Sequence, residues 1–260
     1  MKFVEKSTVV LKKCNASDVD VAYAAWVSNF GEEAEERDTT DVSKLINFLY
    51  SNRHMSPFEH GSFTFFIDTP IFVAREFMRH RTWSYNETSG RYKELEGRFY
   101  LAPEDRPLVQ EGRIGNYHFV PGNKEQYEFL RAEQENAFQT SWDAYQYCLK
   151  KGIAKEVARN VLPVATMTQF YATANPRNVM QFLSLRNDGP ALKEIRDVAV
   201  EIEKAFSEAM PLTYAAYKQY DWRNDAEELE FLRSKVDSLT SELAWGNPAK
   251  HYQGESDYAR

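Results

Sequence analysis

Cysteine is nearly absent from this chain. Its two cysteines, Cys14 and Cys148, are far apart, and neither belongs to a CxxC pair or to a zinc-type Cys/His spacing. The sequence therefore excludes a disulfide scaffold, and it predicts no metal site and a reducing, cytoplasmic location. Cys148 falls within a predicted helix and is expected in the core, so we expect no cysteine nucleophile.

Long apolar runs, a basic surplus and glycine-rich phosphate loops are also lacking. No apolar stretch approaches the roughly 18 residues that cross a membrane, and the N-terminus lacks the apolar run of a signal peptide, so no membrane partner is expected. The net charge of −7 argues against a nucleic-acid partner. Neither GxGxxG nor GxxxxGKS/T occurs, so a nucleotide cofactor would not be bound in the Rossmann or P-loop manner.

The composition is that of a globular protein. Hydrophobic residues make up 43% of the 260 positions, which is enough to bury a full core. Helical periodicity dominates, while β-branched and aromatic stretches predict strands near residues 5, 63, 99 and 169. Because these strands are not evenly interleaved with crossover helices, we expect an α+β fold in which mixed helices pack on a central, mainly antiparallel sheet.

The domain organisation is predicted to be simple. We expect a single catalytic domain over residues 1–220. Residues 103–123 are rich in proline and glycine, which predicts an exposed loop insertion. Residues 221–260 are expected to form a C-terminal helical extension with a loose tail, because apolar residues recur at helical spacing between Asp225 and Trp245.

The stretch from Phe72 to Tyr92 concentrates positive charge. Its basic side chains are those of Arg75, Arg79, His80, Arg81 and Arg91, and its two acids are Glu76 and Glu87. Pro70 is predicted at the first position of a helix, on which Arg75 and Arg79 would repel each other by roughly 0.2–0.5 kcal/mol. The surplus charge suits a phosphate-bearing ligand, and the alternative is a solvated basic face paired with acids elsewhere.

A second basic set consists of Arg159, Arg177 and Arg186. Arg186 follows the apolar run at 182–185, so its guanidinium is expected in a partly buried site that contains an acid or a ligand. Structural ion pairs are the alternative for the whole set. Asn175 and Gln181 could bind the edge of a ring, although Asn175 before a proline is an equally good helix cap.

Two other groups of polar residues suggest chemistry less strongly. His54 and His60 have no third ligand at a credible spacing, so structural or ligand-contacting histidines are expected rather than metal ligands. Ser89 lies near His80 and Glu87, as in a serine hydrolase, but no GxSxG elbow supports that interpretation.

The order of residues in the first basic stretch is more specific than its charge. Arg79-His80-Arg81, followed after seven residues by Ser89 and then by Arg91 and Tyr92, resembles the signature of the flavin-dependent thymidylate synthases. Further stretches carry the resemblance over roughly residues 20–220: HMSPFEHGSFTF, EVARNVLP and NPRNVMQFLSLR. It implies a flavoprotein methyltransferase with a mixed α/β fold, which converts dUMP to dTMP with FAD as cofactor, methylenetetrahydrofolate as one-carbon donor and NADPH as reductant. It also implies a homotetramer with shared active sites.

By matched position, the resemblance also implies which residues bind each ligand. Those expected to bind FAD are Ser56, Arg79, His80, Arg81, Glu87, Asn175, Arg177 and Gln181. Those expected to bind dUMP are Glu76, Arg79, Glu87, Thr88, Ser89, Gly90, Arg91, Arg159 and Arg186. Arg186 takes the catalytic position, where a fixed cation favours the N3-ionised uracil and raises the electron density at C5 without a cysteine adduct.

The chain departs from the family pattern at several positions. A histidine that many members carry soon after the Arg186 position is replaced by the run at 187–190, Gln181 stands where some members have Asn, and Trp26 stands where some have Arg. The alternative function is a non-catalytic regulatory protein of the same fold that binds the nucleotide or the flavin without turnover.

Overall fold

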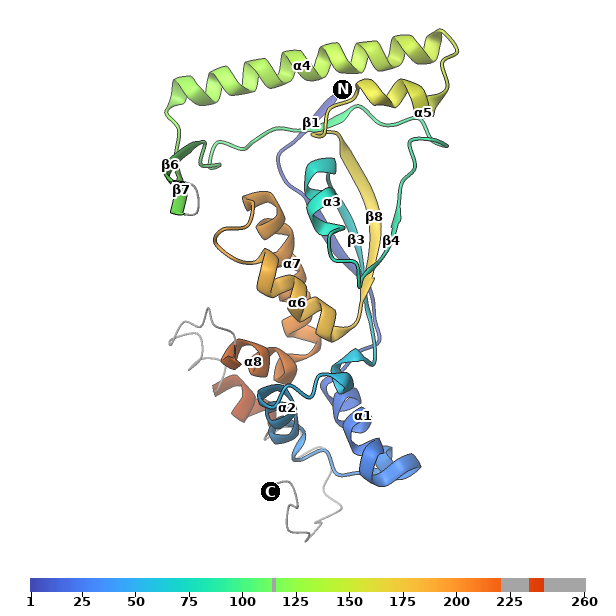
Figure 1. The fold of residues 1–260 in the computed structure, drawn as a ribbon, viewed down its shortest axis with the longest axis vertical. Helices are drawn as coiled ribbons and strands as arrows, with labels where there is room; N and C mark the ends of the chain where they lie inside the picture. The colour runs from blue at the N-terminus through green and yellow to red at the C-terminus, as the bar shows by residue number, and fades with distance from the viewer. Residues whose placement is uncertain (114–115, 221–233, 241–260) are drawn as a thin grey trace. The chain divides into compact units, whose positions relative to one another are not determined.

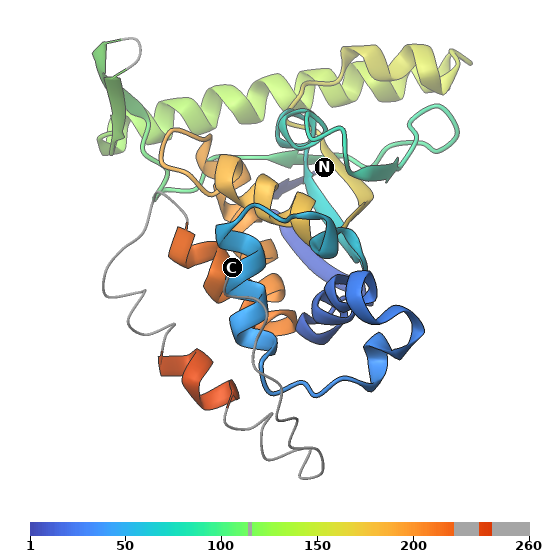
Figure 2. The same ribbon diagram turned by 60° about the horizontal axis from the view of Figure 1, so that its bottom comes forward.

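The computed structural model describes residues 1–113, 116–220 and 234–240 (Figures 1 and 2). The chain divides into two compact units. The first contains residues 1–10, 65–173 and 186–200, and the second contains residues 11–64, 174–185 and those from 201 onward. The predicted helix at 225–245 lies outside the described residues except for 234–240, which are helical.

A four-stranded sheet carries most of the elements around the predicted site. Its strand order is β2-β3-β8-β4, with the bounds β2 (Thr8–Cys14), β3 (Phe63–Pro70), β8 (Met167–Ala174) and β4 (Ser84–Glu87). Strands β4 and β8 are antiparallel, and their register places Tyr85 opposite Ala172. The α+β class with a mainly antiparallel sheet is therefore confirmed. The strand predicted near residue 5 is split into β1 (Lys2–Val4) and β2.

Helix α3 (Ile71–Phe77) follows β3 directly and begins the basic stretch. Pro70 is its N-cap, with an extended backbone at φ −68° and ψ 151°, so the helix begins one residue later than predicted. Val73, Ala74 and Phe77 are buried. The Phe77 ring meets Phe170 of β8 edge-to-face at 5.6 Å between centroids, so α3 packs on β8.

The first unit also contains a long helix and a parallel strand pair. The elements are β1 (Lys2–Val4), β5 (Arg98–Tyr100), α4 (Lys124–Lys150), α5 (Lys155–Ala158) and a 3-10 turn at Arg159–Val161. Strands β1 and β5 are parallel. Phe138 of α4 stacks on Phe99 of β5 at 5.2 Å between centroids, which fixes the helix on the strand pair. Gly152, at φ +81°, follows the end of α4, where a residue with positive φ commonly ends a helix.

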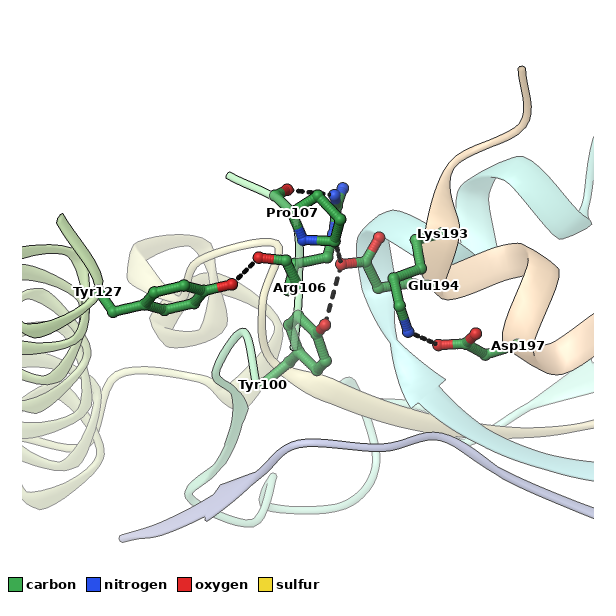
Figure 3. A network of polar contacts seen from close by, with 7 residues as sticks. All are labelled: Tyr100, Arg106, Pro107, Tyr127, Lys193, Glu194 and Asp197. Carbon is green, nitrogen blue, oxygen red and sulfur yellow. Dashed lines mark hydrogen bonds and ion pairs between the residues drawn. The ribbon is translucent and has the colours of Figure 1, made fainter. Parts of the chain in front are cut away.

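Residues 103–123, predicted as an exposed loop, contain an antiparallel hairpin. Its strands are β6 (Val109–Arg113) and β7 (Asn116–Val120), and it lies at the N-terminal end of α4 (Figures 1 and 2). A polar network anchors the segment to α7 (Lys193–Ala209) (Figure 3). Arg106 Nε donates to Glu194 Oε1 at 2.8 Å, and the Tyr100 hydroxyl donates to the same oxygen at 2.9 Å. The Tyr127 hydroxyl donates to the Arg106 carbonyl, so α4 joins this network.

The second unit is mostly helical. Its elements include α1 (Asp18–Phe30), a 3-10 segment (Gly31–Glu36), α2 (Val42–Ser51), a second 3-10 segment (Ser56–Glu59) and α8 (Pro211–Tyr220), together with α6 (Pro176–Arg186) up to residue 185 and the end of α7. Ser17 caps α1, with its hydroxyl oxygen accepting from Asp20 N at 3.2 Å. Buried Asp18 accepts from the backbone N–H groups of Leu212 and Thr213, both at 2.8 Å, and so links the first turns of α1 and α8. Among the described helices, none has the length and apolar character that crossing a membrane requires.

Candidate active site

The turn that follows α3 presents the Arg79-His80-Arg81 segment. The α-helix ends at Phe77, and the next bonds are of the tighter i→i+3 kind, from Arg79 N to Glu76 O and from His80 N to Phe77 O. Arg79 therefore lies beyond the helix. The prediction that Arg75 and Arg79 share one helix face is wrong, because the helix is too short to carry both.

Arg186 is the last residue of α6, and it meets this turn within the first unit. Its Nε donates to His80 Nε2 at 3.0 Å, its Nη1 lies 3.4 Å from Glu76 Oε2, and its Nη2 donates to the Glu76 carbonyl at 3.3 Å. The Arg186 side chain is 19% exposed and the Glu76 side chain 33% exposed. The expectation that Arg186 enters a partly buried site with an acidic partner is thus met by Glu76.

His80 is neutral in this arrangement. Arginine is permanently protonated, so an imidazole nitrogen that accepts from it must be unprotonated, and the ring proton resides on Nδ1. Burial, and secondarily the Arg186 charge, lower the pKa of His80 from 6.5 to about 4. The cluster therefore carries one fixed cation, one neutral imidazole and one carboxylate at neutral pH.

Five of the residues predicted to bind the nucleotide, at positions 87–91, lie at the end of β4 and in the loop that follows it. Glu87 accepts from the Thr168 hydroxyl on β8, and Thr88 N donates to the Gln169 carbonyl at 2.8 Å. Ser89 begins a turn in which its carbonyl accepts from Tyr92 N at 3.2 Å. The sheet edge thus fixes the start of the loop.

Gly90 brings this loop against Arg159. A Cβ added at Gly90 would lie 3.1 Å from Arg159 Cδ and 3.1 Å from Leu95 Cδ1, so a side chain there would displace these two neighbours by a few tenths of an ångström. Arg91 Nε donates to Glu156 Oε2 at 2.9 Å, and Glu156 lies three positions before Arg159 in the chain. The structure therefore joins the loop at 87–91 to Arg159, although 69 positions separate Gly90 from it.

The arginines of the first unit differ in their partners. Arg91 and Arg186 pair with carboxylates. Across the described residues, the side chains of Arg79, Arg81 and Arg159 form no ion pair, and Arg79 and Arg81 are exposed. Unpaired guanidinium groups beside a loop suit phosphate, so this donor set fits both a nucleotide phosphate and the diphosphate of FAD.

The remaining residues predicted to bind FAD lie in the second unit. Asn175 caps α6, with its Oδ1 accepting from Asn178 N at 2.9 Å, as the helix-cap alternative predicts. Arg177 forms an ion pair with Glu59. Gln181 is exposed on the same helix, and Ser56 begins the 3-10 segment that contains Glu59. Arg177 and Arg186 thus both form ion pairs with carboxylates of the chain, which was the alternative interpretation of the second basic set.

The geometry speaks against a serine hydrolase. The Ser89 hydroxyl accepts from Arg91 N at 3.3 Å within its own turn. The His80 Nε2 that would act as a base accepts from Arg186 instead. Nucleophile and base are therefore not paired.

Two partners of the predicted site residues were missed from the sequence. Thr168 pairs with Glu87 across 81 positions, and Glu59 pairs with Arg177 across 118 positions. Glu59 stands inside the stretch HMSPFEHGSFTF, so the family resemblance pointed to its neighbourhood. Thr168 carries no local signal, because its role depends on the register of β4 and β8.

Comparisons with known proteins show the family to which the chain is similar. The family model described as "Thymidylate synthase complementing protein" matches residues 9–212. A flavin-dependent thymidylate synthase of Streptomyces avermitilis is 49% identical over 221 residues, which cover 81% of this chain and 90% of the relative. One from Tropheryma whipplei is 44% identical over 227 residues, covering 84% of this chain and 94% of the relative.

A solved structure extends the similarity to the fold. It is a UMP/dUMP methylase from Streptomyces cacaoi bound with 5-Br dUMP, with a TM-score of 0.80 and 40% identity, and the match covers 85% of this chain and 98% of that one. The similarity spans both units and every predicted site residue from Ser56 to Arg186. On the strength of the family match, the identity and the cluster of Arg186 with the Arg79-His80-Arg81 turn, the chain belongs to the family of flavin-dependent thymidylate synthases.

Proposed function

We propose that this chain converts dUMP to dTMP by reductive methylation, with FAD as cofactor, methylenetetrahydrofolate as one-carbon donor and NADPH as reductant. The observation that carries the proposal is the contact of Arg186 with His80 in a chain of this family. The names of the relatives support a flavin-dependent synthase, and the solved neighbour was obtained with a dUMP analogue.

The overall reaction sets the chemistry that the site must support. The methylene carbon of the folate forms a bond to C5 of the uracil and its bonds to the folate nitrogens break, while the C5 proton leaves. One hydride then turns the methylene into a methyl group, so the folate leaves as tetrahydrofolate. When bound, FAD supplies this hydride from NADPH.

Arg186 activates the uracil in this proposal. A fixed cation beside the ring stabilises negative charge at N3 and its carbonyl neighbours, and so increases the electron density at C5. Glu76 and His80 hold the guanidinium by three contacts, which orients it before the nucleotide binds. Because the His80 imidazole is neutral, it orients Arg186 without adding a second repelling charge.

The unpaired arginines supply the anion-binding part of the site. We assign the loop at 87–91 and Arg159 to the dUMP phosphate, and Arg79 and Arg81 to the FAD diphosphate. We also assign His80 and Glu87 of the first unit to FAD. In the second unit, we assign Ser56, Asn175, Arg177 and Gln181 to the same cofactor. Arg177 would exchange Glu59 for the cofactor or contact both.

The cysteines agree with activation by charge. Cys14 is exposed on β2, and Cys148 is partly buried near the end of α4. Neither lies on an element that carries a predicted nucleotide-binding residue, so a covalent cysteine adduct at C6 is not part of the proposal.

We also propose a homotetramer with shared active sites. Light scattering after size exclusion tests this, with an expected mass four times the 30.2 kDa of one chain. A monomer with full turnover would refute the shared sites.

The decisive experiment is a visible absorption spectrum of the purified protein, recorded before and after anaerobic addition of NADPH. We expect a flavin spectrum that bleaches with NADPH and recovers when dUMP and methylenetetrahydrofolate are added, with dTMP formed. Binding of dUMP with no flavin spectrum and no dTMP, even after FAD is added, would favour the regulatory alternative instead.

A further inference from the structure

The hydroxyl of Tyr85 lies at the carbonyl groups of the turn that carries Arg79 and His80. It is 2.9 Å from the His80 carbonyl oxygen and 3.1 Å from the Phe77 carbonyl oxygen. A phenol has one proton, so the two carbonyls share it. The Phe77 carbonyl belongs to the last residue of α3, and the His80 carbonyl belongs to the turn that follows the helix.

The same carbonyls close the two tight turns on either side of His80. The Phe77 carbonyl accepts from His80 N at 3.1 Å, and the His80 carbonyl accepts from Trp83 N at 3.2 Å. The Tyr85 hydroxyl therefore cross-links both turns at once. Since His80 lies between them, its backbone is held from both sides.

Tyr85 is itself fixed on the sheet. It belongs to β4, opposite Ala172 of β8, and it is half-buried. Its ring packs edge-to-face on Phe77 at 6.0 Å and on Phe170 at 6.2 Å between centroids. Burial raises the pKa of the Tyr85 hydroxyl, so the group keeps its proton and remains a donor.

We propose that Tyr85 is a positioning residue, which holds the Phe77–Trp83 turn so that His80 meets Arg186. The imidazole Nε2 lies 3.0 Å from Arg186 Nε, and a small rotation of the turn would break this contact. The effect on turnover rests on the proposed function, whereas the effect on the contact of His80 with Arg186 does not.

The test removes only the hydroxyl, by Tyr85→Phe. The control is Tyr147→Phe, which removes the hydroxyl of a tyrosine that is 61% exposed on α4. A third variant replaces Tyr85 by p-aminophenylalanine, which keeps the ring and restores a donor at the same place. The measurements are the NMR titration of His80, the dissociation constant of FAD, and kcat and KM for dUMP.

In Tyr85→Phe, we expect the titration midpoint of His80 to rise from about 4 toward its ordinary value of 6.5, because the imidazole moves away from the guanidinium and toward water. We expect the dissociation constant of FAD to rise and kcat to fall, each by about fivefold, which is the effect of one net hydrogen bond. The p-aminophenylalanine variant should restore all three values, and Tyr147→Phe should leave them unchanged.

Two results would overturn the proposal. One is a Tyr85→Phe protein whose His80 titration matches that of Tyr147→Phe, and the other is a p-aminophenylalanine variant that behaves like Tyr85→Phe. If no protein in the series binds flavin or forms dTMP, yet the His80 midpoint rises only in Tyr85→Phe, then the proposed function fails and the positioning role of Tyr85 stands.

Discussion

Arg186 Nε lies 3.0 Å from His80 Nε2, although 106 positions separate the two residues in the chain. The imidazole accepts this hydrogen bond without neutralising the guanidinium. Among the described residues, the carboxylate that pairs with Arg186 is that of Glu76, and it is 3.4 Å from Arg186 Nη1, at the long end of the hydrogen-bond range. The cluster therefore fixes the direction of a cation and leaves much of its charge available to a bound ring.

Replacing Arg186 should abolish most of the activity and preserve the fold. In Arg186→Ala, we expect kcat/KM for dUMP to fall by at least about hundredfold, because a preorganised charge at the reacting ring is lost. The measurement is dTMP formation by chromatography, together with a thermal unfolding curve. Arg131→Ala removes an arginine that is 50% exposed on α4 and serves as control, with activity expected to be unchanged. Near-normal turnover in Arg186→Ala would remove the proposed role.

The low pKa of His80 should make stability depend on pH. The folded protein releases its proton near pH 4 and the unfolded chain near 6.5, so the unfolded state binds more protons between these values. The free energy of unfolding should therefore rise with pH over this window and level off above about 6.5. Urea unfolding between about pH 4 and pH 7 measures this slope.

His80→Gln should flatten that slope, because glutamine does not titrate. His118→Gln is the matched control, since the His118 side chain is 70% exposed on the hairpin. Equal slopes in His80→Gln and His118→Gln would show that burial beside Arg186 does not depress the pKa of His80.

A methyl group at Gly90 should weaken nucleotide binding. The new Cβ would lie 3.1 Å from Arg159 Cδ, so the arginine stem must shift away from the loop. For Gly90→Ala, we expect KM for dUMP to rise by roughly tenfold, as for the loss of one charge-assisted phosphate contact, with little change in unfolding temperature. Steady-state kinetics measures this. Gly189→Ala is the control, because a Cβ there meets nothing within 4 Å. An unchanged KM in Gly90→Ala would separate Arg159 from the phosphate.

The network of Figure 3 should contribute strongly to stability. The side chains of Arg106 and Glu194 are only 13% and 7% exposed, and Glu194 Oε2 has no hydrogen-bond partner among the described residues. Arg106→Met should lower the free energy of unfolding by about 3 kcal/mol, because it leaves a buried carboxylate with Tyr100 as a weaker partner. Arg131→Met, at a solvated ion pair, should cost less than about 1 kcal/mol.

A double-variant cycle completes that measurement. If the buried charge causes the loss, adding Glu194→Gln to Arg106→Met should recover part of it, since neither charge then remains. Strictly additive effects would mean that Arg106 acts through packing, for example through its position 5.4 Å from the Phe119 ring centroid.

Local features of the chain were predictable where one stretch decides its own structure. Ser17 caps α1 and Gly152 follows α4, because hydroxyl capping and a positive φ are requirements of single positions. The hairpin at 109–120 was missed, because its segment is rich in proline and glycine and its place depends on Arg106 meeting Glu194 from 88 positions away. No local pattern encodes such a pairing.

The site, too, was predictable from the sequence only in part. The motif predicted that the loop at 87–91 and Arg159 belong together, and the structure joins them through Gly90. It could not predict that α3 would end before Arg79, because the apolar periodicity continues to Met78 while the backbone tightens at Phe77. The carboxylate and imidazole that meet Arg186 also required the fold, since α6 and α3 are distant in sequence.

The parallel pairing of β1 with β5, with Lys2 opposite Arg98, also has a consequence for synthesis on the ribosome. The first strand leaves the exit tunnel long before its partner exists, and at roughly 5–20 residues per second the delay amounts to about 5–20 s. During that interval its backbone donors and acceptors have no strand beside them. A nascent chain arrested before residue 98 should therefore expose an extended segment that chaperones can bind. In a chain arrested well beyond residue 100, that segment should be paired and no longer accessible to chaperones.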